Sequence, residues 1–291
     1  VGALDEVGDR EPTALVRDRG GLQRLGRLVA DDVDARSHDR RAVGRVDAPR
    51  DRLALLEDEV DVVEAGRKAV GMVRGGEADV LMKGLIPTSD YMKQILDKER
   101  GLLPEGNVLT HVTVVELPAY LASQGKLLFV ADVAIIPAPD LPTKVKILEY
   151  CIAAAHSFGI GEPKAALIAA TEKVNPKMKA TVHAAEITEM AARGEIKGAV
   201  VHGPLALDVA LSPEACVIKG LDSPVGGSAD ILVFPNIESG NVFYKSSTLL
   251  SGGRLAAAVV GTSVPCVLTS RADSEESKFL SIAMGCRLAG N

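Results

Sequence analysis

The stretch ADILVFPNIESGNVFYKSSTLL, residues 229–250, holds one complete strand–loop–helix unit. Four consecutive apolar residues, Ile231–Phe234, are typical of a buried strand, and Asn241–Leu250 is expected to form a helix. Asn236 and Ser239 lie between them, which is more polar chemistry than a turn requires. Because open α/β sheets bind ligands where strands pass into helices, this unit predicts both a fold class and the place of a site.

The same alternation of short apolar runs and longer amphipathic segments continues from Glu64 onward, which predicts an α/β fold with mainly parallel strands. The other expected strands are Asp79–Met82, Leu109–Val115, Leu127–Ala131, Ala165–Ala170, Gly198–Val201, Ala256–Val260 and Cys266–Leu268. The other expected helices are Thr88–Lys98, Leu141–Ser157, Met178–Ala192, Leu205–Lys219 and Asp273–Leu288. Many of these helices follow Pro, Ser, Asp or Asn, which favour a first helical turn or its cap.

Composition excludes several classes of protein. A chain of 291 residues exceeds what one compact core usually organises, so two domains are expected. The net charge of −6 argues against nucleic acid or an anionic membrane as the main partner. We find no signal peptide and no apolar run of bilayer length, so the cytoplasm is the expected location. The four scattered cysteines lack metal-ligand spacing and are expected to be buried free thiols, with no metal site.

The first 67 residues differ in composition from the rest. They contain twelve arginines and no lysine, whereas residues 68–291 contain six arginines and fifteen lysines. Three interpretations compete: a disordered charged arm, a helical region with surface ion pairs, or a GC-rich gene segment translated in the wrong frame, with the sense resuming near Val62–Lys68. The absence of Ile, Met, Phe, Tyr, Cys and Asn, and of any sustained periodicity, favours the wrong-frame hypothesis. We assign no functional residue to residues 1–60.

Two junctions before the quoted unit also carry polar residues. Lys83 stands at an expected strand end, followed by Gly84 and a helix that Thr88 opens, and this arrangement suits an anionic group. A capped turn with a solvated lysine explains the same residues equally well. In VHGPLALD, Gly-Pro is expected to turn the chain sharply out of its strand, which sets Asp208 one helical turn after Pro204.

The last junction is LTSRADSEES, residues 268–277. An arginine such as Arg271 can hold a phosphate through two N–H groups, and the neighbouring Ser270 hydroxyl can donate to a developing oxyanion. Asp273 or Ser274 would cap the next helix; a surface arginine beside an incomplete capping box is the alternative interpretation. The candidate substrate-binding residues of all four junctions are Lys83, Gly84, Thr88, Asp208, Asn236, Ser239, Asn241, Lys245 and Ser274.

Four segments together resemble the phosphate acetyl/butyryltransferase family in order and spacing. They are ADVLMKGLIPTSDYMKQIL, GPLALDVALS, GGSADILVFPNIESGNVFYKS and VPCVLTSRADSEESKFLSIA, and the resemblance runs from about Glu64 to the end of the chain. The runs GPLALD, PNIESGN and TSRADS are more similar to the butyryl branch than to the acetyl branch.

The resemblance implies a fold of two α/β/α domains with mainly parallel sheets and an active-site cleft between them. Mapped onto this chain, residues 1–107 and 261–291 would form the first domain and residues 108–260 the second. The implied reaction is butanoyl-CoA + phosphate = butanoyl phosphate + CoA, by direct acyl transfer. Acyl-CoA and phosphate would be the partners, with coenzyme A as a substrate and no further cofactor. A homo-oligomer is the usual assembly.

Residue by residue, the resemblance implies catalytic roles at the last junction. Arg271 would hold the phosphate and Ser270 would stabilise the tetrahedral oxyanion. The acetyl branch has an aspartate six residues after this arginine as a candidate thiol base, whereas this chain has Ser277. Asp273 or a nearby glutamate could replace it. His202 also departs from the aspartate that relatives commonly have before Gly-Pro.

Three alternatives compete with a butyryltransferase. The first is a phosphate acetyltransferase, because the sequence does not reveal the volume of the acyl pocket, which sets the preferred chain length. The second is a non-catalytic acyl-CoA-binding module, like those fused to malic enzymes; retention of Ser270 and Arg271 argues against it. The third is a decarboxylating dehydrogenase of the isocitrate or isopropylmalate type, which needs more arginines than the six after Lys68. No dinucleotide, P-loop or serine-hydrolase motif is present.

The wrong-frame hypothesis predicts a property of the encoding DNA. Another forward frame across residues 1–60 should give a sequence that aligns with family members and joins the present frame near Val62–Lys68. Translating the DNA in all frames checks this. A continuous match of residues 1–60 to relatives in the present frame contradicts the hypothesis.

Overall fold

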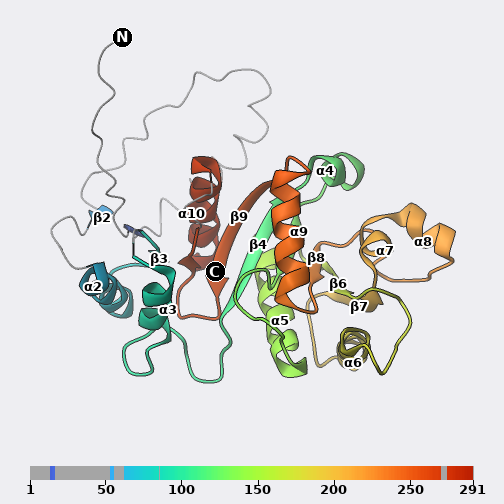
Figure 1. The fold of residues 1–291 in the computed structure, drawn as a ribbon, viewed down its shortest axis with the longest axis horizontal. Helices are drawn as coiled ribbons and strands as arrows, with labels where there is room; N and C mark the ends of the chain where they lie inside the picture. Colours follow the sequence, from blue (N-terminus) through green and yellow to red (C-terminus); the bar gives the residue numbers. More distant parts are fainter. Residues whose placement is uncertain (1–13, 17–52, 56–61, 85, 270–273, 291) are drawn as a thin grey trace, which may run out of the picture.

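A computed structural model describes residues 14–16, 53–55, 62–84, 86–269 and 274–290. Within them, helices cover both faces of one twisted sheet, so the predicted α/β class is confirmed (Figure 1). No helix in these ranges is both long and apolar enough to cross a membrane.

The strands are β1 Ala14–Val16, β2 Leu53–Leu55, β3 Val80–Met82, β4 Thr110–Glu116, β5 Leu128–Ala131, β6 Lys164–Ile168, β7 Val200–Leu205, β8 Ile231–Val233, β9 Arg254–Val260 and β10 Cys266–Val267. The helices are α2 Val62–Arg74, α3 Thr88–Leu96, α4 Pro118–Gln124, α5 Leu141–Ser157, α6 Lys179–Ala192, α7 Leu207–Leu211, α8 Pro213–Lys219, α9 Ile237–Leu249 and α10 Glu275–Ala289. All eight expected strands are present, and α5 has the expected bounds.

The strands follow the order β2-β1-β3-β10-β9-β4-β5-β8-β6-β7. β3 and β10 are parallel, and so are β5, β8, β6 and β7. Three antiparallel pairs, β10–β9, β9–β4 and β4–β5, separate these two parallel groups. Three reversals make the groups run in opposite directions, so their carboxyl ends lie at opposite edges of the sheet. The predicted boundaries of the two domains fall near the start of β4 and the end of β9. The division into two domains remains a prediction.

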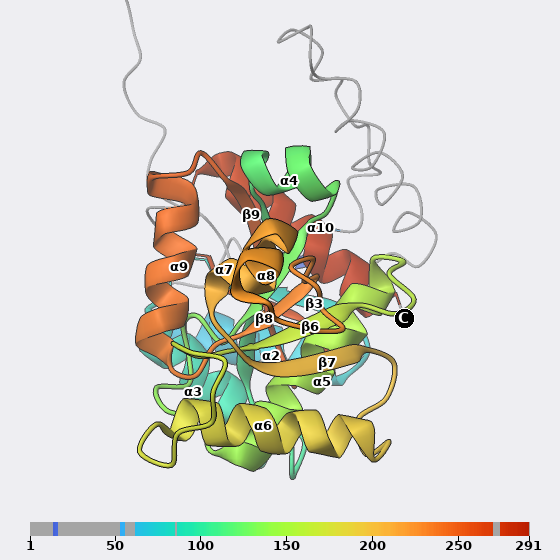
Figure 2. The same cartoon turned by 90° about the vertical axis from the view of Figure 1, so that its right-hand side faces the viewer.

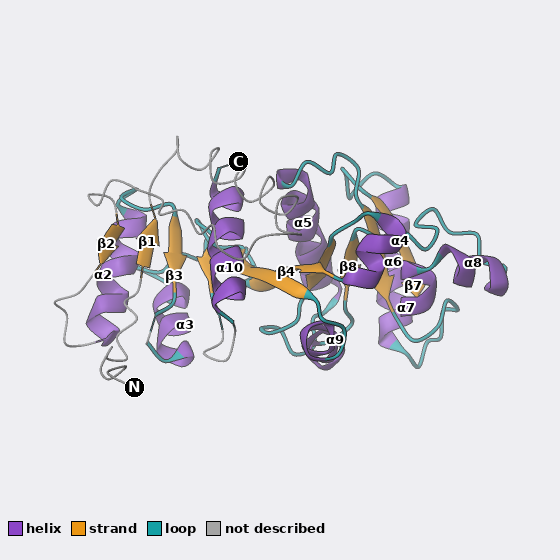
Figure 3. Ribbon diagram, turned by 90° about the horizontal axis from the view of Figure 1, so that it is seen from above, coloured by secondary structure: helices purple, strands orange, loops and turns teal. Residues whose placement is uncertain are grey.

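Helices on the two faces bury alternate residues of each strand. In β5, Phe129 and Ala131 belong to the same core cluster as Ile147 of α5, whereas Leu128 and Val130 belong to the cluster on the other face. This is the period-two alternation of a strand buried on both sides, and each large apolar side chain contributes roughly 1.5–3 kcal/mol. α5 and α10 lie on one face, and α3 and α9 on the other (Figure 3).

The segment after β7 corrects the prediction of one helix over residues 205–219. Two short helices, α7 and α8, meet at Ser212, whose Oγ accepts a hydrogen bond from the Ala215 N–H at 3.2 Å. The next residue, Pro213, has no N–H to continue a preceding helix, so it begins a new one. Figure 2 shows this helical pair above β6 and β7, and α6 and α9 at different flanks of the strands.

Gly203 and Pro204 also behave differently from the prediction. They continue β7 instead of turning the chain out of it, and the β6–β7 register shifts between Ala166 and Ile168. A Cβ added at Gly203 would lie 2.6 Å from the Leu167 Cβ, so glycine here permits close approach of the two strands.

Helices α2 and α4 were not predicted. α4 has the expected boundary residues in hindsight: Pro118 in its first turn and Gly125 at its end, with a left-handed φ of 67°. Its seven residues are too few to show a helical period against the adjacent strands.

Asp132 joins the end of β5 to the start of β4. Its side chain is 2% exposed, and one carboxylate oxygen accepts the Thr110 hydroxyl at 2.6 Å and the His111 N–H at 2.9 Å. The other oxygen accepts the N–H groups of Ala134 and Ile135, each at 2.7 Å. Four donors thus satisfy a buried carboxylate where the chain leaves β5.

Replacing Asp132 with Ala should lower the free energy of unfolding by about 3 kcal/mol or more, because four buried donors lose their acceptor. Urea unfolding followed by circular dichroism measures the loss. Lys93→Ala is the control, since the exposed Lys93–Asp90 pair is worth about 0–1 kcal/mol. Equal urea midpoints for the two variants would show that Asp132 does not hold the two strands together.

Candidate functional site

The first and last polar junctions leave neighbouring strands. β3 and β10 pair in parallel with Leu81 opposite Cys266, and the Lys83 N–H continues the ladder by donating to the Val267 carbonyl at 3.0 Å. Lys83 and Gly84 therefore adjoin the strand that leads into Thr269 and the predicted catalytic segment. The carboxyl ends of two parallel strands meet here, as expected for a ligand site.

Ser270, Arg271 and Asp273 lie outside the described residues. The helix after them is well defined: Ser274 is its N-cap, with an Oγ that accepts the Ser277 N–H and donates to the Ser277 Oγ, both at 3.1 Å. Ser274 thus caps α10, as predicted, and its hydroxyl is engaged in that role. An anion bound ahead of this cap would meet the positive end of a fifteen-residue helix.

Lys83 is buried, with 7% of its surface exposed, and its Nζ donates to the Gly84 carbonyl at 3.1 Å. A lysine ammonium at the carboxyl end of a strand has the charge that suits an anionic ligand. Thr88 is the first residue of α3, as predicted, but it is exposed and the N-cap is Pro87. Any contact of Thr88 with substrate would come from the helix surface.

Arg254 ties α10 to the central strands, a role that sequence reasoning missed. Its guanidinium pairs with Glu276 of α10 at 2.7 Å and with Glu116 of β4 at 3.4 Å. Its Nε is buried with no hydrogen-bond partner among the described residues. A lone arginine opening the apolar run LAAAVV was the available signal. Glu276 is engaged with Arg254, and the assignment of Asp273 as the thiol base remains a prediction.

The third junction is built around the cap of α9. Asn236 Oδ1 accepts the Ser239 N–H at 3.0 Å and its hydroxyl at 2.8 Å, so α9 begins at Ile237 and not at the expected Asn241. Asn241 instead lies within the helix and donates to the Val133 carbonyl at 2.9 Å. These three predicted binding residues position the helix, while Lys245 is exposed on it.

Asp208, at the second junction, is held by lysine. Its carboxylate pairs with Lys219 of α8 at 2.8 Å, and Lys219 also pairs with Glu172 at 3.1 Å. The hydrogen bond from Lys219 lowers the pKa of Asp208. This cluster joins α7, α8 and the loop after β6.

The four junctions form two groups. Those of β3 and β10 share one edge of the sheet, and those of β7 and β8 lie at the opposite edge, because the two sets of strands run in opposite directions. The cleft implied by the resemblance therefore remains a prediction.

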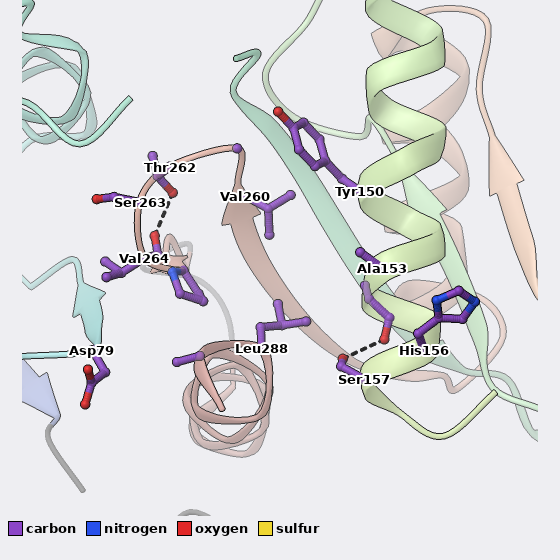
Figure 4. A pocket seen from close by; sticks show the side chains of 14 residues that line it. Asp79, Tyr150, Ala153, His156, Ser157, Val260, Thr262, Ser263, Val264 and Leu288 are labelled. Atoms are coloured by element: carbon purple, nitrogen blue, oxygen red, sulfur yellow. Dashed lines mark hydrogen bonds between the residues drawn. The ribbon is translucent and has the colours of Figure 1, made fainter. Parts of the chain in front are cut away.

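A cavity of about 570 Å³ lies apart from both groups, between the second half of α5, the turn from β9 to β10 and the end of α10 (Figure 4). The residues predicted for the site do not line it. Two of its hydroxyls are already bonded, Ser157 to the Ala154 carbonyl at 2.7 Å and Thr262 to the Val264 carbonyl at 2.6 Å. The site at the β3–β10 junctions remains a prediction.

All four cysteines are buried and free, as predicted. Burial raises the pKa of the Cys266 thiol to about 11, which keeps it protonated near neutral pH. Across the described ranges, no three His, Cys, Asp or Glu side chains gather as metal ligands.

Comparison with known proteins gives consistent relatives. The chain is 47% identical over 236 residues to a phosphate butyryltransferase from Clostridium acetobutylicum, covering 81% of this chain and 77% of that protein. It is 46% identical over 226 residues to a phosphate acetyltransferase from Thermotoga maritima, covering 78% and 75%. The crystal structure of a branched-chain phosphotransacylase from Enterococcus faecalis superposes with a TM-score of 0.72 at 41% identity, covering 79% and 80%.

The family model described as phosphate acetyl/butaryl transferase matches residues 54–286, which include all four junctions. The match begins within the compositionally different first 67 residues and includes residues 54–67. The chain belongs to the phosphate acetyl/butyryltransferase family.

Proposed function

We propose that this phosphate acyltransferase uses butanoyl-CoA and phosphate, forming butanoyl phosphate and CoA. The observation that carries the proposal is the parallel pairing of β3 with β10, which sets buried Lys83 beside the strand leading into Ser270 and Arg271. A lysine and a helix N-terminus then belong to one edge of the sheet, and the predicted phosphate-binding arginine stands between β10 and that helix in the sequence.

In the direction that forms the thioester, the CoA thiolate sulfur attacks the carbonyl carbon of the acyl phosphate. A C–S bond forms. The bond between the carbonyl carbon and the bridging phosphate oxygen breaks, and phosphate leaves with the electron pair. Arg271 holds the phosphoryl oxygens, Ser270 donates to the oxyanion and Asp273 takes the thiol proton. Lys83 adds positive charge near the departing phosphate. Coenzyme A is a substrate in this proposal, and no further cofactor takes part.

Relatives support the choice of acyl group. A relative named phosphate butyryltransferase shares 47% identity with this chain, which favours butanoyl-CoA. A relative named phosphate acetyltransferase is nearly as similar, at 46%, so acetyl-CoA is the second candidate.

We also propose a homo-oligomer in the cytoplasm, with no nucleic-acid or membrane partner. Large apolar side chains on α8 and at the end of α9 favour contact with a second copy. Val217 is 81% exposed, and Leu250 is 83% exposed. Such residues, when adjacent on a surface, are typical of protein interfaces.

The proposed reaction predicts phosphate-dependent release of thiol. With acyl-CoAs from acetyl to valeryl, turnover by the full chain should peak at butyryl. Ser270→Ala and Arg271→Ala should each lower kcat about 100-fold, the usual order for one oxyanion donor, while Arg100→Ala should leave it unchanged. A thiol-specific dye measures the rate. Tight acyl-CoA binding without turnover would favour the regulatory-module alternative.

Asn236 offers a test that separates helix capping from substrate binding. Asn236→Asp keeps the acceptor that caps α9 but removes the amide donor, so stability should stay within about 0.5 kcal/mol. If the amide also binds substrate, KM should rise several-fold in the same variant. Thermal melting and initial rates give the two readouts. Asn236→Ala is the comparison, because it loses the cap as well and should cost about 1 kcal/mol. An unchanged KM in Asn236→Asp removes Asn236 from the binding site.

A further inference from the structure

Lys144 is a buried cation that forms no ion pair among the residues that the structure describes. It lies in the first turn of α5, is 5% exposed, and its Nζ contacts Nδ1 of His183 on α6 at 3.2 Å. An ammonium has three N–H donors, and within the described part of the chain His183 is the sole acceptor for them. Burial alone lowers the pKa of Lys144, with no carboxylate opposing it.

His183 is the neutral hydrogen-bond partner of Lys144 in this pair. To accept from Lys144 through Nδ1, its imidazole must be neutral, which leaves the Nε2–H as a donor. Burial and then Lys144 lower the pKa of His183, which favours that neutral form. His183 is only partly buried, so it connects Lys144 with the surface. The charge of Lys179 also lowers the pKa of His183, whereas the carboxylates of Glu186 and Asp140 raise it.

The start of α6 is suited to an anion. Its N-cap is Met178, which supplies no side-chain acceptor, and its first turn contains Lys179 and no acidic residue. The Met178 carbonyl accepts the Thr181 N–H at 2.9 Å, which leaves the N–H groups of Lys179 and Ala180 at the start of this fourteen-residue helix for a ligand. The first turn of α5 differs, because Asp140 caps it by accepting the Thr143 N–H at 3.0 Å.

The strand order places Lys144 and His183 beside a point where neighbouring connections leave toward opposite faces of the sheet. β8 lies between β5 and β6, and all three are parallel. The loops after β5 and β6 lead to α5 and α6 on one face, whereas the loop after β8 leads to α9 on the other. Ligands bind where connections leave the carboxyl ends of strands toward opposite faces. The Ile237 N–H donates to the Pro137 carbonyl at 3.0 Å, which fixes the start of α9 against the loop before α5.

We propose that Lys144 and His183 form a binding site for a phosphate group between the first turns of α5 and α6. This site is separate from the β3–β10 junctions, since it lies at the other edge of the sheet. Its ligand rests on the proposed function, whose substrates supply two sources of the same chemistry: inorganic phosphate and the phosphates of coenzyme A. Phosphoryl oxygens would accept the free donors of Lys144, the Nε2–H of His183 and the first N–H groups of α6.

Calorimetric titration of the full chain tests the site with inorganic phosphate, coenzyme A and 3′-dephospho-CoA. Lys144→Met removes the ammonium and keeps the stem; Lys146→Met is the matched control, because Lys146 lies on the same helix and pairs with exposed Glu149 at 3.0 Å. We expect Lys144→Met to weaken binding about tenfold or more, as for a lost charge-assisted hydrogen bond, and Lys146→Met to bind like the wild type. Should Lys144→Met fail to fold, Lys144→Gln replaces it, with melting curves as the check.

The three ligands distinguish the sources. A loss confined to inorganic phosphate identifies the free ion. A loss with coenzyme A but not 3′-dephospho-CoA identifies the 3′-phosphate, and equal losses with both identify the diphosphate. Unchanged binding of all three ligands by Lys144→Met overturns the site. If the wild type catalyses acyl transfer and Lys144→Met binds all three ligands normally, only the phosphate site is rejected. If Lys144→Met weakens binding but the wild type does not catalyse acyl transfer, only the proposed function is rejected.

Discussion

The antiparallel ladder between β4 and β9 is the constraint on which the rest of the structure depends. Seven residue pairs join the two strands, from Thr110 opposite Val260 to Glu116 opposite Arg254. Each strand is also paired on its other side, β9 with β10 and β4 with β5. The ladder therefore sets the direction of every strand on either side, and it decides which loops can share an edge.

Two polar groups secure the ends of this ladder. At one end the Asp132 carboxylate binds the first residues of β4; at the other, Arg254 bridges Glu116 and Glu276. The first is buried and compensated by four donors, whereas the second is partly exposed and more open to screening by salt. Both groups lie where the chain passes from the central strands to a loop or helix that carries candidate ligand contacts.

The sequence alone predicted the strands well, but it predicted poorly the places where one element passes into the next. Strands such as β5 and β8 were found because a strand buried on both faces is a short, continuous apolar run. The Gly203–Pro204 pair was misjudged because its role depends on how closely β7 approaches Leu167, a contact distant in sequence. The start of α9 was placed four residues late, since a polar run was interpreted as a loop when Asn236 was in fact a cap.

The site was predictable in its location more than in the roles of its residues. Parallel strands bring Lys83 beside β10, as expected for a site where strands pass into helices. Several other polar residues that were expected to bind ligand instead form hydrogen bonds or ion pairs within the protein. Polar residues at helix starts serve capping and binding with the same atoms, so sequence cannot separate the two roles. Lys144 and His183 gave no signal at all, because each stands inside an ordinary helical pattern and they meet only through packing.

The position of β10 has a consequence for biosynthesis. It is the last strand in the described part of the chain, yet it lies between β3 and β9, both of which leave the ribosome earlier. Until Cys266 and Val267 are made, these two strands present open edges toward each other, and open edges are sites of mispairing. A nascent chain that stops short of β10 thus lacks the middle of its sheet and not merely its tail. The residues proposed for catalysis follow β10 directly, so the step that closes the sheet also delivers the catalytic segment.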